Sequence, residues 1–161
     1  VAPMLSYYYG AGDREKLRQT VALSLKIISC ISVVTLTLSL ALTRPLVSVF
    51  TAPDNPVFAL AVTGNRFCSV ALLFIGFNIF ASGLFTALSN GIVSAVLAFS
   101  RSFVFMVAAM LTLPALLDVT GVWLATPVAE AMALALAAFM LVRYQTRYGY
   151  SAHAMPEPAE G

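Results

Sequence analysis

Four long apolar runs alternate with short polar segments along this chain of 161 residues. They cover residues 23–42, 67–88, 92–113 and 122–142. Each run is long enough for a helix that crosses the hydrocarbon core of a membrane, which takes roughly 20 residues. Backbone polar groups in lipid must be satisfied within the segment, so the runs predict α-helices. The expected fold is all-α, a polytopic membrane protein with four transmembrane helices.

Polar and helix-breaking residues separate the runs. Asp13 is a suitable N-cap for the first helix, and Pro56 suits an early position of a long second helix that extends to Leu88. Only residues 89–91 separate the second and third runs, so we expect these two helices to be antiparallel neighbours. Residues 1–150 are therefore assigned to one bundle. Residues 151–161 contain two prolines and no apolar period, and they predict a disordered tail.

Composition and charge support a membrane protein. Hydrophobic residues make up 60% of the chain and charged residues 10%, whereas soluble domains carry about 25% charged residues. Cytoplasmic loops next to membrane helices are enriched in Lys and Arg. With four spans both ends lie on one side, and that side holds most of the basic residues: Arg14, Lys16, Arg18, Lys26, Arg143 and Arg147. We expect both ends in the cytoplasm and the protein in the plasma (inner) membrane.

Nothing in the sequence points to soluble enzyme chemistry. The single histidine, His153, lies in the tail, and there is no paired-carboxylate motif, Cys/His cluster or phosphate-binding loop. The basic run 14–18 is interpreted as a cytoplasmic flank of a membrane helix. We expect no enzyme activity, no cofactor or metal and no nucleic-acid partner. We expect the lipid bilayer to surround the helices of this protein.

Glu130 is the strongest candidate for a functional residue, because a carboxylate within a membrane span usually marks a substrate or ion pathway, a proton relay or a buried ion pair. Pro127 lies one turn before it. A proline frees the carbonyl of Trp123, four residues earlier, and can kink the helix. Beside such a kink a carboxylate could bind and release a proton. The alternative is that Glu130 pairs with a neighbouring helix and holds the bundle in register.

Arg101 has two possible roles. Its depth in the third run is close to the depth of Glu130 in the fourth, so an ion pair between them is geometrically allowed. Alternatively, its long side chain extends to the cytoplasmic headgroups. The alanines at positions 125, 129, 133 and 137 recur at every fourth residue and predict a close helix contact beside Glu130.

The second run carries polar and aromatic candidates. Asn78, Ser82 and Thr86 recur at every fourth residue and therefore share one helical face. They either line a polar cavity or form hydrogen bonds between helices. Phe74 and Phe77 either face a lipophilic cation in the cavity or pack against lipid and neighbouring helices.

An ordered set of landmarks carries a family resemblance. In chain order they are PMLSYYYGAGDREKLRQ, RPLVSVF, NRF, SNG, FSR and GVWLATPVAEAMAL. Together they resemble the multidrug and toxic compound extrusion family of antiporters over residues 3 to about 145. Tyr8 departs from the family pattern, in which an asparagine often stands between the two tyrosines.

The resemblance implies two six-helix bundles, of which this chain matches the last four helices. The partner would be the missing N-terminal bundle of the same polypeptide. The implied activity is export of lipophilic or cationic small molecules by alternating access, in exchange for protons or sodium ions. In related sodium-coupled members an acidic residue lies on the helix that matches residues 67–88, where this chain has none.

Two other functions stay open at the level of sequence. One is a flippase for lipid-linked sugars or polysaccharides with a related fold, for which a more basic cavity is expected. The other is a small membrane protein that does not transport and acts as an assembly or regulatory partner.

Overall fold

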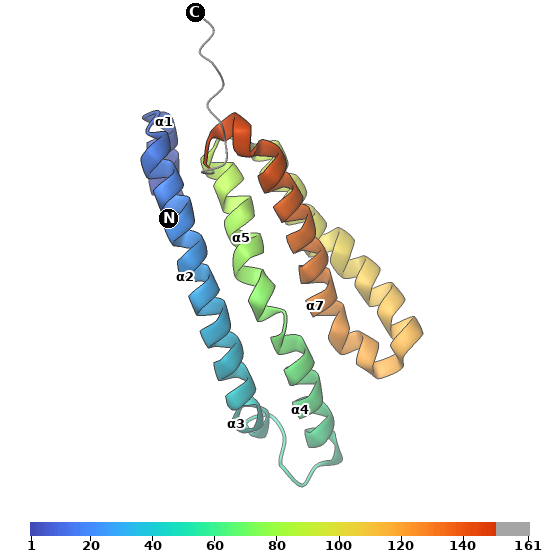
Figure 1. Ribbon diagram of the computed structural model, residues 1–161. Helices are drawn as coiled ribbons and strands as arrows, with labels where there is room; N and C mark the ends of the chain where they lie inside the picture. Colours follow the sequence, from blue (N-terminus) through green and yellow to red (C-terminus); the bar gives the residue numbers. More distant parts are fainter. Residues whose placement is uncertain (151–161) are drawn as a thin grey trace, which may run out of the picture.

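The computed structural model describes residues 1–150, and this part consists of helices joined by short loops. The predicted tail, residues 151–161, lies outside the described residues. Three helical stretches are long and apolar enough to cross a membrane: Arg14–Ala41, Pro56–Ala87 and Gly91–Tyr148. The last stretch folds back on itself, and its two arms are the third and fourth predicted spans (Figure 1). The prediction of an all-α polytopic membrane protein is confirmed.

The first two helices form a hairpin at one end of the bundle. Helix α1 (Ala2–Gly10) is followed by a tight turn in which Gly12 has a φ of 71°. Helix α2 (Arg14–Ala41) begins after Asp13, whose carboxylate accepts a hydrogen bond of 3.0 Å from the Lys16 N–H. This bond lowers the pKa of Asp13. The predicted N-cap is therefore confirmed.

The predicted long second helix is interrupted. After α3 (Thr43–Ser48), helix α4 runs from Pro56 to Ser69 and helix α5 from Leu72 to Ala87. Between them the N–H groups of Val70 and Ala71 bond to carbonyls three residues earlier, at 3.2 and 3.1 Å. Such bonds tighten the backbone locally into a 3₁₀-type turn. The prediction of one continuous helix up to Leu88 is wrong at this point.

The last two spans form one long hairpin. Helix α6 (Gly91–Phe99) continues through a π-helix, η1 (Ser100–Phe105), into α7 (Met106–Tyr148). The chain reverses at Asp118, which has a φ of 50° and interrupts the helical conformation of α7. Gly121 is needed here, because a Cβ at this position would overlap the Leu113 carbonyl. α7 then ends at Gly149 in the left-handed conformation.

The core lies mainly between α1, α2, α5 and the second arm of α7. It contains Leu5, Leu17, Leu84, Phe85 and Ala137. Many apolar side chains point outward instead, and Phe50 is 88% exposed. An apolar exterior suits a bundle surrounded by lipid or by further helices.

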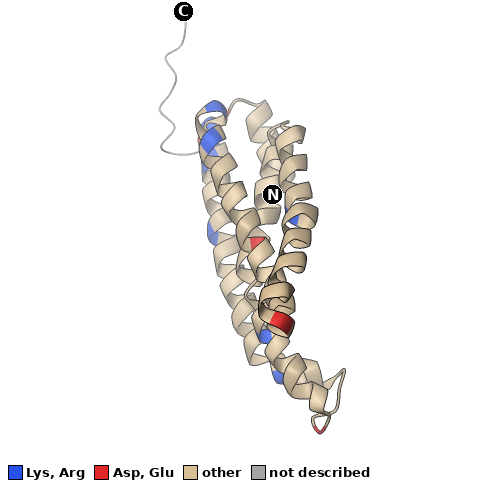
Figure 2. Ribbon diagram, turned by 90° about the vertical axis from the view of Figure 1, so that its right-hand side faces the viewer, with Lys and Arg blue, Asp and Glu red and all other residues tan. Residues whose placement is uncertain are grey.

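Both ends of the described chain lie at the same end of the bundle (Figure 1). The Arg18 guanidinium donates a hydrogen bond of 2.8 Å to the Gly149 carbonyl, which ties the start of α2 to the end of α7. Lys and Arg residues gather mainly at this end (Figure 2). The arrangement agrees with an even number of spans.

Candidate functional site

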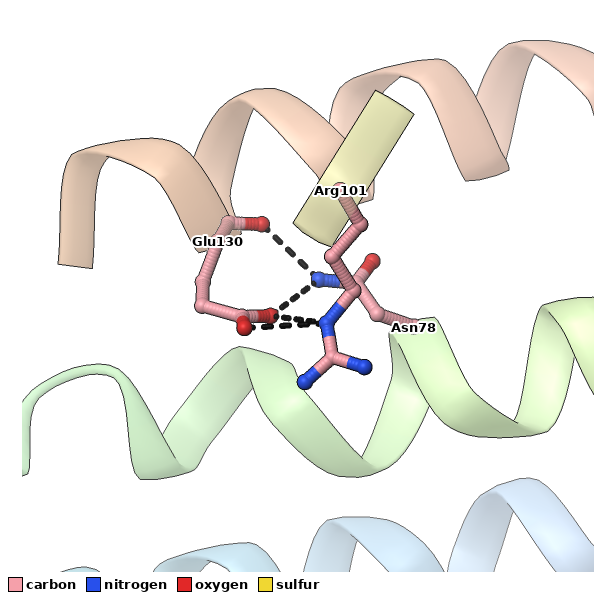
Figure 3. Close-up of polar contacts among 3 residues, drawn as sticks. All are labelled: Asn78, Arg101 and Glu130. Carbon is pink, nitrogen blue, oxygen red and sulfur yellow. Dashed lines mark hydrogen bonds and ion pairs between the residues drawn. The ribbon is translucent and has the colours of Figure 1, made fainter. Parts of the chain in front are cut away.

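Glu130 is the centre of a polar network that joins three helical segments (Figure 3). The Nε of Arg101 in η1 lies 2.9 and 3.0 Å from the two carboxylate oxygens of Glu130 in α7. The amide nitrogen of Asn78 in α5 donates to Glu130 Oε2 at 2.7 Å and to the Glu130 backbone carbonyl at 2.9 Å. One carboxylate therefore connects α5, η1 and α7.

The network is buried among helices. Glu130 is 6% exposed and Asn78 4% exposed, and the Arg101 side chain is 25% exposed. The Arg101–Glu130 ion pair that the sequence allowed is thus formed. Arg101 does not extend to the headgroups in this structure. A second ion pair, between Lys16 and Asp13, lies at the surface.

Local helix geometry brings these side chains together. Arg101 lies in the π-helix, a form of helix that is frequent at functional sites. On α7, Ala125 and Ala129 are buried against Ala109 of the opposite arm. Their small side chains let the two arms of the hairpin approach closely. The helix contact predicted from the alanine repeat is confirmed.

One acceptor in the network has no partner. The Oδ1 of Asn78 is buried and forms no hydrogen bond within the described part of the chain. Buried polar atoms of this kind are rare, because each costs the free energy of its lost hydration. Figure 3 shows this oxygen on the side of the amide that faces away from the Glu130 carboxylate. If Glu130 took up a proton, Arg101 would lose its ionic partner. Proton uptake at Glu130 would therefore rearrange the contacts between three helical segments.

Pro127 leaves the backbone carbonyl of Trp123 without its usual helical donor, as predicted. The Cys68 thiol of α4 lies 3.5 Å from this oxygen and donates to it. The sequence did not indicate Cys68 as the partner. The contact connects α4 to α7 about two turns of helix before Glu130.

The hydroxyls of Ser82 and Thr86 form hydrogen bonds between helices. Ser82 Oγ and Thr86 Oγ1 lie 3.0 and 2.7 Å from Ser94 Oγ on α6. Ser94 was missed at the level of sequence, although the short connection at residues 89–91 placed α6 next to α5. Cavity lining by Ser82, Thr86 and the half-buried rings of Phe74 and Phe77 stays a prediction.

Comparison with known proteins gives two matches. A family model described as MatE matches residues 1–112, a range that includes Asn78 and Arg101 and ends before Glu130. A solved structure described as protein A is similar, with a TM-score of 0.83 and 30% sequence identity. The alignment covers 92% of this chain and 32% of that chain, so the chain spans about a third of the other protein. No curated protein matches the sequence.

Proposed function

Because the chain belongs to the MatE family, the multidrug and toxic compound extrusion transporters, we propose that it is the C-terminal part of a cation-coupled efflux antiporter. The proposed substrates are lipophilic or cationic small molecules. The chain would work with a second, N-terminal bundle by alternating access. The coverage of only 32% of the similar solved structure supports a longer polypeptide.

The observation that carries the proposal is the buried network of Asn78, Arg101 and Glu130. A carboxylate that holds three helical segments together can link its protonation to their packing. In the ionised state Glu130 binds both partners. In the protonated state it would release Arg101, and the contact between the two arms of the hairpin would weaken. Alternating access needs such a change in helix packing.

We propose the proton as the coupling ion at this site. The Arg101 guanidinium already lies against both Glu130 oxygens. A sodium ion bound to the same carboxylate would lie close to that positive charge and be repelled by it. A proton can replace the arginine at the carboxylate without this repulsion. Sodium coupling would then depend on residues outside this chain.

The proposed orientation has both ends of the chain in the cytoplasm and the bundle in the inner (plasma) membrane. The support is the common location of the two ends and the basic residues around them (Figure 2). The MatE match favours a transporter over a flippase for lipid-linked sugars and over an assembly partner.

The test is proton-driven export by the full-length protein in sealed vesicles. Replacement of Glu130 by glutamine keeps the shape and an oxygen that can accept from Asn78, but it removes the carboxylate that would take up the proton and the ion pair with Arg101. We therefore expect loss of proton-driven export and of its pH dependence. The Glu15→Gln variant, which changes a surface carboxylate of α2, is the matched control and should behave as the unchanged protein. Size-exclusion profiles check that each variant is folded. Unchanged pH-dependent export by Glu130→Gln would reduce Glu130 to a structural role.

A further inference from the structure

Two neighbouring cavities open at the end of the bundle that carries both chain ends. The first has a volume of about 360 Å³ and is lined by the rings of Tyr8, Tyr9 and Tyr148 and by the side chains of Arg14 and Arg147. The guanidinium of Arg147 lies 5.6 Å from the centre of the Tyr148 ring, which holds it over an aromatic face. This cavity therefore combines two positive charges with aromatic walls.

Residues 1–150 provide no ion-pair partner for the positive charge of this cavity. Among residues 1–150, neither Arg14 nor Arg147 forms an ion pair. The nearby acidic groups have other partners. Asp13 pairs with Lys16 at 3.0 Å, and Glu15 accepts a hydrogen bond of 3.2 Å from Gln19. An anion with several acceptor oxygens, such as a phosphate group, is the complementary ligand for two guanidinium groups.

The second cavity is apolar. It has a volume of about 460 Å³, and its walls include Val21 and Leu25 of α2, Phe80 and Leu84 of α5, and Leu141 of α7. Arg18 stands at its polar end and is held there by its hydrogen bond to the Gly149 carbonyl. Between Arg18 and Leu25, seven residues of helix give the wall a length of roughly 10 Å.

The same two helices line both cavities in succession. Along α2, Arg14 belongs to the first cavity and Arg18, one turn later, to the second. On α7, Tyr148 lines the first cavity, and Gln145, which comes earlier on the same helix, lines the second. A ligand that spans both would have an anionic head at the end of the bundle and an apolar tail directed along the helices.

We propose that this pair of cavities binds an anionic phospholipid, with its phosphate between Arg14 and Arg147 and one acyl chain in the apolar cavity. A free phosphate compound would leave the apolar cavity unused, and a hydrocarbon would leave both guanidinium groups without an anion. Basic pockets between membrane helices are known to bind anionic headgroups. The site is separate from Glu130 and does not rest on the coupling mechanism.

The test uses the full-length transporter in detergent, with phosphatidylglycerol as the probe and native mass spectrometry to count bound lipid. We expect phosphatidylglycerol to bind more tightly than zwitterionic phosphatidylethanolamine. The double variant R14Q/R147Q should lose roughly thirtyfold in affinity for phosphatidylglycerol, since both cations near the headgroup are removed. The double variant R14K/R147K keeps the charge and should retain most of the binding.

Matched controls separate the site from general charge and folding effects. R44Q/R66Q removes two exposed arginines at the other end of the bundle and should leave binding unchanged. Ala22 lines the apolar cavity, so A22W should fill it and weaken lipid binding. The neighbouring Leu23 is 58% exposed and lines neither cavity, so L23W should bind lipid normally.

Several results would overturn the proposal. Equal affinity for the two lipids, or full binding by R14Q/R147Q, would exclude recognition of the headgroup by these arginines. Full binding by A22W would exclude the acyl-chain cavity. Glycerol 3-phosphate that displaced the lipid at equal concentration would show a site for a soluble anion instead.

Discussion

Arg101 and Glu130 depend on each other because both lie within apolar spans. Burying either charge alone in the membrane would cost free energy. The ion pair offsets this cost only while both residues are present. Asn78 adds a hydrogen bond of 2.7 Å to the same carboxylate. The network is thus sensitive to the loss of any member.

Replacing Arg101 by glutamine should destabilise the bundle by about 3–5 kcal/mol, because Glu130 would be left as a buried charge without its cationic partner. The double variant R101Q/E130Q removes both charges and should recover most of this loss. Thermal unfolding of the purified protein in detergent measures both. Equal melting temperatures for R101Q and the unchanged protein would contradict the importance of the pair.

Part of this site could be predicted from residues. Arg101 and Glu130 are charged residues within apolar runs at similar depth, so helix rise allowed an ion pair between them as one of two alternatives, the other being an Arg101 side chain that extends to the headgroups. The partnership of Asn78 with Glu130 did not follow, because a single sequence does not determine how one helix rotates toward its neighbours. For the same reason, Ser94 could not be identified as the partner of Ser82 and Thr86. It also stayed open whether the helical face that carries Ser82 and Thr86 lines a cavity.

Close contacts between helices depend on small residues at defined positions. A Cβ at Gly64 of α4 would lie 2.7 Å from atoms of the Trp123 indole on α7. At Gly83 of α5 a Cβ would meet nothing within 4 Å. A methyl group would therefore clash with a neighbouring helix at Gly64 and would fit without contact at Gly83.

Replacing Gly64 by alanine should destabilise the protein by about 1–3 kcal/mol through overpacking against Trp123. Gly83→Ala is the matched control and should be neutral or stabilising by up to about 1 kcal/mol, because alanine favours the helix. Thermal unfolding of both variants in detergent measures the difference. The double variant G64A/W123F should recover stability if the clash is the cause, and a stable G64A would contradict the close contact.

The elements themselves were largely predictable. The apolar runs, separated by polar and helix-breaking residues, located the spans, and Asp13 and Pro56 marked helix starts. The interruption at Val70–Ala71 was not predictable, because it falls in an apolar segment without proline or glycine. The π-helix at Ser100–Phe105 likewise has no sequence marker, since helical periodicity is nearly the same on both sides of it.

The molecule as a whole resembles part of a larger assembly. Apolar side chains are exposed along several helices, and the chain covers 32% of the similar solved structure. The common location of the chain ends was predictable from the even number of spans. The surface that meets the remaining helices was not, because lipid and protein both favour an apolar exterior.

Residues 1–161 purified alone should not move a fluorescent cationic dye against its gradient in sealed vesicles, because the proposed transport cavity needs both bundles. The full-length protein should move it. Circular dichroism of the reconstituted short chain checks that it is helical. Dye transport by the short chain would contradict the need for a second bundle.

The pairing of Arg101 with Glu130 also bears on biosynthesis. The two residues are 29 positions apart and lie on opposite arms of one hairpin. Arg101 therefore leaves the ribosome first and has no counter-charge until the second arm has been made. An arginine at the centre of a lone span opposes insertion by about 2.5–3.5 kcal/mol. The ion pair can offset this free-energy cost only when both arms of the hairpin enter the bilayer together.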